Sequence, residues 1–241
     1  VKMKIDKSGD RVRRMFGQIA GRYDLMNHLL SLNVDRYWRW RTVGKVPAAD
    51  GTRVLDICTG TGDLALAYFK KSKGKTQIVA ADFCPEMLEI GAQKGHRAGA
   101  NGHIRWVEAD AQHMPFPDNS FEVVTVAFGL RNVTNTDAGL REMVRVCAQG
   151  GRVAVLEFST PQWQPFKAIY AAYFRYVLPR IGQLLARNRE DAYNYLPASV
   201  SDFPQGGELG RKMLEAGLSD VRWHPLTLGV ATLYLGTKCT E

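Results

Sequence analysis

The chain has 241 residues, of which 45% are hydrophobic and 23% are charged, and this balance excludes a disordered or fibrous protein. A chain of this length can bury a complete core, so we expect one domain over 1–241. The formal net charge of +8 predicts an anionic partner, and nucleic acid and an anionic membrane surface are the two usual candidates.

The four cysteines are widely spaced and include no C-x-x-C pair, so we expect reduced thiols and neither a disulfide framework nor a metal site. No apolar run approaches eighteen residues, and the charged start of the chain lacks an apolar signal region. We therefore expect a cytoplasmic protein that could lie at the inner face of the membrane.

The first predicted element is a helical cap over residues 9–46. Phe16, Ile19, Ala20 and Tyr23 recur there at helical spacing. The same region holds a concentration of arginines: Arg11, Arg13, Arg14, Arg22, Arg36, Arg39 and Arg41. The positive charge therefore lies on an appendage, where a substrate or a surface would be met.

Residues 53–63, R-V-L-D-I-C-T-G-T-G-D, predict a strand that enters a helix through a glycine turn. Such a turn lets backbone N–H groups at the positive end of a helix approach a ligand, so Gly60, Thr61 and Gly62 are candidate contacts. The glycines also fit the loose pattern of dinucleotide-binding folds. Asp56 could brace the loop or meet a cationic ligand. Because the loop has no basic residue for a pyrophosphate, it resembles the site of S-adenosylmethionine (SAM)-dependent methyltransferases.

A second apolar strand, 77–82, ends in Asp82, twenty residues after Gly62. A carboxylate at that place can accept both hydroxyls of a ribose. Phe83 and Met87, at the start of the next predicted helix, could cover the base of the nucleoside.

The third strand, 104–107, leads to Asp110 and Ala111. Asp110 could accept a hydrogen bond from the exocyclic amine of adenine, and the Ala111 N–H could serve a ring nitrogen. Ligands of open α/β sheets lie at the carboxyl ends of the strands, so these residues should converge with Asp82.

The remaining elements complete an α/β pattern. We expect a helix over 137–147 that stops at Gly150-Gly151, and strands over 121–128, 152–158, 221–226 and 229–236. The last two should pair as a hairpin, which predicts a mostly parallel seven-stranded sheet with an antiparallel C-terminal hairpin. The domain would then divide into the 9–46 cap, a 51–158 core, a 160–205 helical lid and a 206–238 C-terminal helix and hairpin.

The lid segment carries an apolar stripe at helical spacing: Phe166, Ile169, Tyr170, Tyr173, Phe174, Val177 and Leu178. Most such stripes face a core. Four aromatic side chains beside the ligand edge of the sheet would also suit a flat apolar substrate.

The run Phe128-Gly-Leu-Arg-Asn-Val133 follows the fourth strand, where a reacting centre should lie. It lacks the Asp/Asn-Pro-Pro-aromatic sequence used for amine methylation and the Pro-Cys nucleophile used for pyrimidine carbons. A nucleic-acid substrate is therefore disfavoured. Arg131 is the candidate of interest, although most arginines in loops form surface salt bridges.

These segments together resemble the ubiquinone/menaquinone biosynthesis C-methyltransferase family over nearly the whole chain. The matching pieces are Tyr23-Asp-Leu-Met-Asn27, Cys58-Thr-Gly-Thr-Gly-Asp63, Met114-Pro-Phe-Pro-Asp118, Phe128-Gly-Leu-Arg-Asn-Val133, Leu156-Glu-Phe-Ser159, Leu178-Pro-Arg-Ile-Gly182 and Tyr193-Asn-Tyr-Leu196. The resemblance implies a class I, Rossmann-like SAM-dependent methyltransferase that converts SAM to S-adenosyl-L-homocysteine. It also implies a polyprenylated quinol acceptor, with demethylmenaquinol favoured. One departure is Ala127, where many members have serine.

Two alternatives stay open: the benzoquinol step of ubiquinone biosynthesis, and a SAM-binding scaffold without activity. In the enzymatic reading, a quinol carbon becomes nucleophilic when the neighbouring hydroxyl loses its proton. Arg131 would stabilise that oxyanion, and Asn132 and Tyr23 would orient the quinol oxygens. The general base is open among Asp24, His113 and a water molecule.

Overall fold

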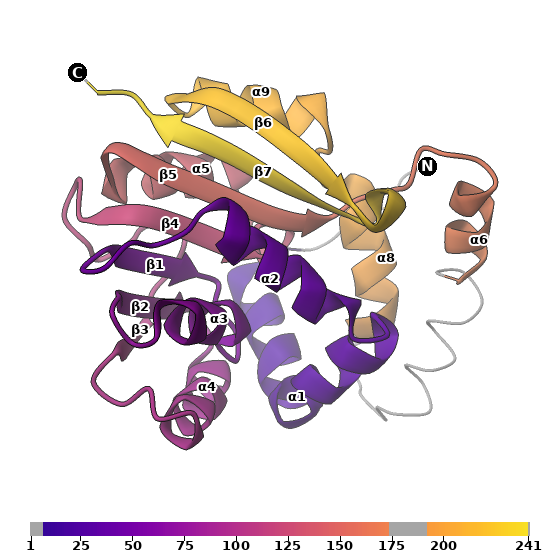
Figure 1. The fold of residues 1–241 in the computed structure, drawn as a ribbon. Coiled ribbons are helices and arrows are strands. Elements are labelled where there is room, and N and C mark those ends of the chain that lie inside the picture. Colours follow the sequence, from indigo (N-terminus) through magenta and orange to yellow (C-terminus); the bar gives the residue numbers. More distant parts are fainter. Residues whose placement is uncertain (1–6, 174–191, 241) are drawn as a thin grey trace.

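The computed structural model describes residues 7–173 and 192–240, which form one seven-stranded sheet (Figure 1). Its order is β3-β2-β1-β4-β5-β7-β6. The strands are β1 Arg53–Ile57, β2 Gln77–Asp82, β3 Ile104–Glu108, β4 Phe121–Ala127, β5 Cys147–Phe158, β6 Leu218–Leu226 and β7 Ala231–Lys238. Strands β1 to β5 pair in parallel, whereas β7 runs antiparallel to both β5 and β6. The predicted parallel sheet with an antiparallel hairpin is confirmed.

Helices cover both faces of the sheet. They are α1 Gly9–Leu30, α2 Val34–Lys45, α3 Asp63–Ser72, α4 Pro85–Arg97, α5 Thr136–Val146, α6 Phe166–Ala172, α8 Ala192–Asp202 and α9 Gly207–Glu215. Two short 3-10 turns add to them, η1 Leu130–Asn132 and η3 Thr227–Gly229. Apolar residues of α2 and α3, such as Trp38 and Leu64, form one core layer; Leu140 of α5 and Met213 of α9 belong to the layer on the other face.

The predicted end of the fifth helix is wrong. Helix α5 ends at Val146, and the strand already begins at Cys147, so Gly150 and Gly151 lie inside β5. A β carbon on Gly151 would stand 2.9 Å from the carbonyl oxygen of Glu122, and the β4–β5 register shifts beside it. The glycine therefore permits close approach of two strands at an irregularity and does not stop a helix.

The predicted helices of the cap and the lid are present in part. Helices α1 and α2 occupy the 9–46 region, and α6 contains Phe166 and Tyr170 of the predicted aromatic stripe. The stripe residues from Phe174 onward lie outside the described residues. Over the described ranges, the structure contains no helix with the length and apolar character needed to cross a membrane.

Candidate active site

The glycine turn between β1 and α3 is shaped by a tryptophan behind it. Gly60 and Gly62 both adopt left-handed backbone, with φ of 58° and 81°. A β carbon on Gly62 would lie 2.3 Å from the ring of Trp106, so only glycine fits there. The Gly60 N–H points instead to Asp82 and donates to its Oδ2 at 2.8 Å. The first glycine thus faces the ligand edge of the sheet, whereas the second is needed for packing.

Asp56 braces the same turn from beneath. It is 1% exposed, and its carboxylate accepts hydrogen bonds from Thr59 Oγ1 at 2.6 Å and Thr125 Oγ1 at 3.0 Å. Burial raises its pKa to about 6, because these bonds only partly offset the loss of water. Of the two roles that the sequence left open, the structure favours the brace.

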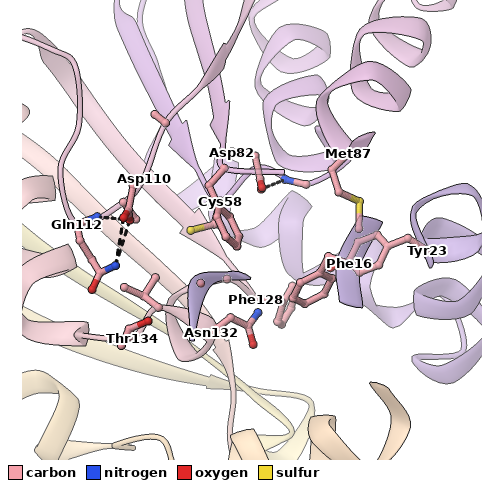
Figure 2. A pocket seen from close by; sticks show the side chains of 17 residues that line it. Phe16, Tyr23, Cys58, Asp82, Met87, Asp110, Gln112, Phe128, Asn132 and Thr134 are labelled. Carbon is pink, nitrogen blue, oxygen red and sulfur yellow. Dashed lines mark hydrogen bonds between the residues drawn. The ribbon is translucent and has the colours of Figure 1, made fainter. Parts of the chain in front are cut away.

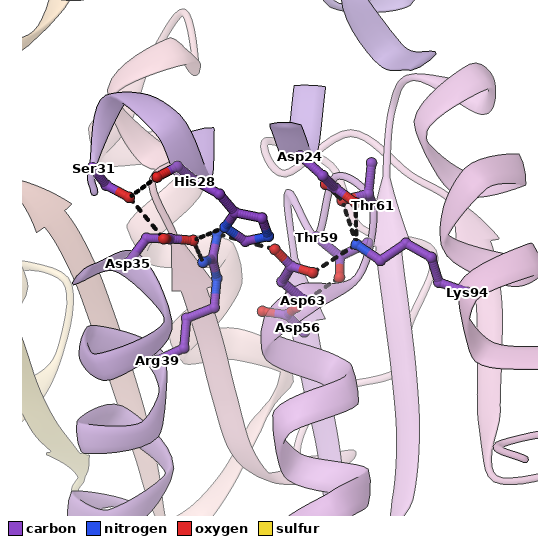
Figure 3. A network of polar contacts seen from close by, with 10 residues as sticks. All are labelled: Asp24, His28, Ser31, Asp35, Arg39, Asp56, Thr59, Thr61, Asp63 and Lys94. Atoms are coloured by element: carbon purple, nitrogen blue, oxygen red, sulfur yellow. Dashed lines mark hydrogen bonds and ion pairs between the residues drawn. The ribbon is translucent and has the colours of Figure 1, made fainter. Parts of the chain in front are cut away.

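Thr61 belongs to a polar network that ties the cap to the core (Figure 3). Its hydroxyl donates to Asp24 of α1, and Lys94 of α4 lies 3.0 Å from it. Lys94 also pairs with Asp24 at 2.5 Å and with Asp63 at 2.6 Å. The Thr61 side chain is thereby committed to helix packing. Asp24, a candidate general base, is committed to the same lysine.

The network continues into α2. Asp63 lies 3.5 Å from Arg39, which pairs with Asp35, and His28 Nδ1 lies 2.9 Å from the Asp35 carboxylate. The ligand atoms of His28, Asp35 and Asp63 lie within 4.8 Å of one another, as in a metal site. Arg39 and Lys94 already supply positive charge to these carboxylates, so the group is better described as an ion-pair cluster.

A cleft lies at the carboxyl ends of the strands, and we call it the cofactor cleft (Figure 2). Its volume is about 80 Å³. Its lining comprises Gly9, Phe16, Tyr23, Cys58, Gly60, Asp82, Phe83, Met87, Ala109, Asp110, Ala111, Gln112, Phe128, Gly129, Asn132, Val133 and Thr134. Six predicted cofactor contacts are among these residues. The other three, Asp56, Thr61 and Gly62, lie outside the lining and shape the loop.

The cleft offers several hydrogen-bond acceptors. The Asp82 carboxylate accepts from the backbone N–H groups of Gly60 and Cys84, and burial raises its pKa. Asp110 accepts from the backbone N–H of Gln112 at 2.9 Å. The Asn132 Oδ1 atom is buried and has no partner among the described residues. An unpaired buried acceptor is costly, so this cleft suits a ligand rich in hydroxyl and amino donors.

A second and larger cavity of about 370 Å³ adjoins the cleft, and we call it the acceptor cavity. Its lining is Met15, Phe16, Ile19, Tyr23, Met26, Asn27, Ser31, Leu32, Val34, Asp35, Trp38, Arg39, Phe128, Arg131, Phe158, Phe166, Tyr170, Tyr173, Tyr195, Leu196, Thr227 and Val230. The wall is mostly apolar and aromatic. Phe16, Tyr23 and Phe128 line both spaces, so the cleft and the cavity meet at these three side chains.

Arg131 is held in the wall of the acceptor cavity by a buried ion pair. It is 5% exposed, and its Nη1 lies 3.0 Å from Oε2 of Glu157, which is 1% exposed. The same nitrogen donates to the carbonyl oxygen of Phe128, and the guanidinium lies 5.3 Å from the ring of Phe158. Its Nε is buried without a partner among the described residues. This arginine therefore keeps one donor for a ligand.

Neither side-chain candidate for the general base reaches the two spaces. His113 is exposed in the turn after Asp110, and Asp24 pairs with Lys94, so both are absent from the linings. The carboxylate that does line the acceptor cavity is Asp35. Burial would raise its pKa, but hydrogen bonds from Ser31 and the charge of Arg39 lower it overall, which makes it a weak base.

The sequence reasoning missed Glu157 and the aromatic wall residues Trp38 and Phe158. Glu157 comes near the end of β5, as Asp82 ends β2, so the strand-end rule would have found it. Trp38 carried no comparable signal, because it comes from the cap and reaches the cavity only through the tertiary fold.

The fold and site define a class I methyltransferase. A SAM-dependent methyltransferase from Aquifex aeolicus has a TM-score of 0.61 and 15% identity, with 97% of this chain and 99% of that chain covered. A chain in the complex of the Haloferax volcanii Trm112 methyltransferase activator with a putative methyltransferase has a TM-score of 0.67 and 14% identity, with coverages of 93% and 97%. These likenesses confirm the predicted fold.

The sequence comparisons identify the family. The model of the ubiE/COQ5 methyltransferase family matches residues 3–238. The chain is 46% identical to the ubiquinone/menaquinone biosynthesis C-methyltransferase UbiE of Geobacter sp. (strain M21), with 97% of this chain and 99% of the relative covered. It is 45% identical to the demethylmenaquinone methyltransferase of Deinococcus radiodurans, with coverages of 98% and 95%. This chain belongs to the ubiE/COQ5 methyltransferase family, which confirms the resemblance noted in its sequence.

Proposed function

We propose that this protein methylates a ring carbon of a polyprenylated quinol with SAM as the methyl donor, and that demethylmenaquinol is its acceptor. The observation that carries the proposal is the meeting of a polar cleft and an aromatic cavity at Phe16, Tyr23 and Phe128. A donor and an acceptor bound on either side of this junction would face each other, and such alignment supplies much of the acceleration of a methyl transfer. The names of the family relatives support the same acceptor class.

The residues of the cofactor cleft fit SAM. Asp82 and Asp110 offer carboxylate oxygens, Phe83 and Met87 offer apolar cover, and Asn132 Oδ1 needs a donor. When bound, SAM supplies an electrophilic methyl group on a sulfonium. We narrow the proposed direct contacts to Gly60, Asp82, Phe83, Met87, Asp110 and Ala111. Asp56, Thr61 and Gly62 would act through the shape of the loop.

The acceptor would be held by Arg131 and Tyr23. The free Nε–H of Arg131 can donate to a quinol oxygen and stabilise negative charge there, since the guanidinium stays protonated. Burial raises the pKa of the Tyr23 hydroxyl, so it remains a donor at neutral pH. The ring carbon gains the methyl group and one proton is released overall. Because the described side chains offer only the weak base Asp35, we assign the proton to water admitted beside Asn132.

The prenyl tail would leave the acceptor cavity along its helical wall. Phe166 and Tyr170 of α6 and Tyr195 of α8 line the cavity opposite the cap, which supports the division into a cap, a core and a 160–205 lid. A substrate with such a tail resides in a bilayer. We therefore propose that the protein makes transient contact with an anionic membrane surface and does not act on nucleic acid.

The test is an assay with isotope-labelled SAM and short-chain naphthoquinol and benzoquinol acceptors, with the product analysed by mass spectrometry. The proposal predicts label on a ring carbon of the naphthoquinol, at a higher kcat/KM than for the benzoquinol. Faster benzoquinol methylation would assign the ubiquinone step. Label on oxygen, or SAM binding without any transfer, would contradict the proposal.

A further inference from the structure

Two exposed leucines are held in an unusual backbone conformation. Leu32 follows α1 with φ of 53° and is 79% exposed, and Leu228 lies in η3 with φ of 56° and is 60% exposed. The left-handed region is disfavoured for residues with a branched side chain, and such strain concentrates at functional sites. Large apolar side chains at the tips of two strained turns point to an apolar partner.

Both leucines lie at the mouth of the acceptor cavity. Leu32 lines the cavity, and Leu228 lies between Thr227 and Val230, which line it as well. Trp38 of α2 donates from Nε1 to Thr227 Oγ1 at 2.8 Å, which joins the two turns. In Figure 1 the α1–α2 turn and the end of the β6–β7 hairpin lie on the same side of the molecule. The two side chains therefore flank one opening.

Basic side chains border the leucines. Lys45 and Arg222 are exposed, and Arg41 has a buried Nε without a hydrogen-bond partner among the described residues. These three cations all act on His224, whose pKa is lowered first by burial and then by their charges. None of them forms an ion pair within the described part of the chain.

The acidic residues of the cap do not neutralise this charge. Asp24 pairs with Lys94, and Asp35 pairs with Arg39, so both carboxylates of residues 21–46 are turned toward the core. The surface that surrounds Leu32 and Leu228 therefore combines an apolar tip with unpaired positive charge.

We propose that this surface, which comprises Leu32, Leu228, Arg41, Lys45 and Arg222, is a docking face for a bilayer that contains anionic phospholipid. The two leucines would enter the acyl region while the cations bind lipid phosphates. The acceptor cavity then opens toward the acyl chains, where a prenyl tail resides. This inference rests on the proposed function for its substrate and adds the orientation of the protein on the membrane.

Vesicle flotation tests the docking face. The wild-type chain should float with phosphatidylcholine vesicles that contain phosphatidylglycerol, and much less with phosphatidylcholine alone. Leu32→Asn and Leu228→Asn should each weaken binding about ten-fold, because each removes one buried leucine while asparagine tolerates the left-handed backbone. Lys45→Gln and Arg222→Gln should each weaken binding to the anionic vesicles about five-fold.

Two matched variants serve as controls. Leu214→Asn removes a leucine that is 52% exposed on α9, on the opposite face of the sheet, and Lys70→Gln removes an exposed charge on α3. Neither should change flotation. Equal losses in the controls, or equal binding of the wild type to neutral and anionic vesicles, would overturn the proposal. So would a dimer that Leu228→Asn abolishes in a chain that does not float.

A second readout separates docking from catalysis. The Leu228→Asn, Arg222→Gln double variant should keep its turnover of a water-soluble short-chain quinol and lose turnover of a long-chain quinol embedded in anionic vesicles. Equal activity of this variant on both substrates would overturn docking. If the wild-type chain methylates no quinol but still binds anionic vesicles through this face, the proposed function fails while the docking face stands.

Discussion

The cofactor cleft and the acceptor cavity are built in different ways. Apart from three residues of α1, the cleft is made by the strand ends and loops of residues 58–134, and its volume is about 80 Å³. The cavity of about 370 Å³ is made largely by helices and turns from four separate parts of the chain. Donor chemistry is thus fixed by the sheet, whereas acceptor chemistry depends on how the appendages assemble around Phe16, Tyr23 and Phe128.

The largest expected effect comes from the Arg131–Glu157 pair. Replacing Arg131 alone would leave Glu157 charged and buried, at a cost of about 3–5 kcal/mol in stability. The double variant Arg131→Met, Glu157→Gln avoids that charge, and we expect kcat to fall about 10²–10³-fold because the oxyanion loses its donor. Steady-state kinetics and calorimetric titration with SAM measure both effects, and SAM affinity should be unchanged.

The control for this variant is Glu157→Gln alone, which leaves the Arg131 charge in place and should retain most of the turnover. Loss of SAM binding in the double variant, with folding intact, would place Arg131 in the cofactor cleft and remove the distinction between the two spaces.

Gly62→Ala tests the packing that shapes the cleft. The added β carbon would meet Trp106 at 2.3 Å in left-handed backbone, so we expect a loss of about 3 kcal/mol in the free energy of unfolding. Gly99→Ala is the matched control, since Gly99 has φ of 74° but open space around it, and should lose about 1 kcal/mol. Urea unfolding measures both; equal losses would show that the tryptophan does not constrain the turn.

Asp82→Asn separates donor binding from acceptor binding. The amide cannot accept ribose hydroxyls as strongly as a carboxylate does, so SAM affinity should fall about 10–100-fold while the KM for the quinol stays constant. Val230→Phe, which narrows the acceptor cavity, should do the reverse. Calorimetry and initial rates report the two constants, and a variant that changes both equally would argue against separate spaces.

The smallest effect concerns the buried brace Asp56. Its folded-state pKa of about 6 lies above the ordinary value of 3.8, so its charge destabilises the folded state above that value, and the penalty is relieved as the pH falls through 6. The wild-type chain should therefore gain about 1 kcal/mol relative to Asp56→Asn between pH 7 and pH 5. Urea unfolding at both pH values measures the difference; an unchanged or opposite difference would contradict the assignment.

The sequence predicted the cleft better than the cavity, for a physical reason. Parallel strands end at one edge, so Asp82, Asp110 and Ala111 could be brought together from strand pattern alone. Asp56, Thr61 and Gly62 were displaced from their expected roles by neighbours from other segments, namely Thr125, Lys94 and Trp106. Their contacts cross distances in sequence that local patterns do not encode.

The cavity shows the same limit more strongly. Arg131 and Tyr23 were found through motifs, but the partner of Arg131 and the aromatic wall depended on the tertiary fold. The helix expected to stop at Gly150-Gly151 failed for a related reason, because strand pairing beside Glu122 required the glycine.

The most direct test of two spaces meeting at one junction is a crystal structure of the chain with S-adenosyl-L-homocysteine and a short-chain naphthoquinol. We predict the cofactor in the cleft, with its sulfur facing Tyr23 and Phe128, and the quinol ring in the acceptor cavity, with one oxygen hydrogen-bonded to Arg131 Nε. A quinol bound outside the cavity, or Arg131 Nε without contact to it, would contradict the account.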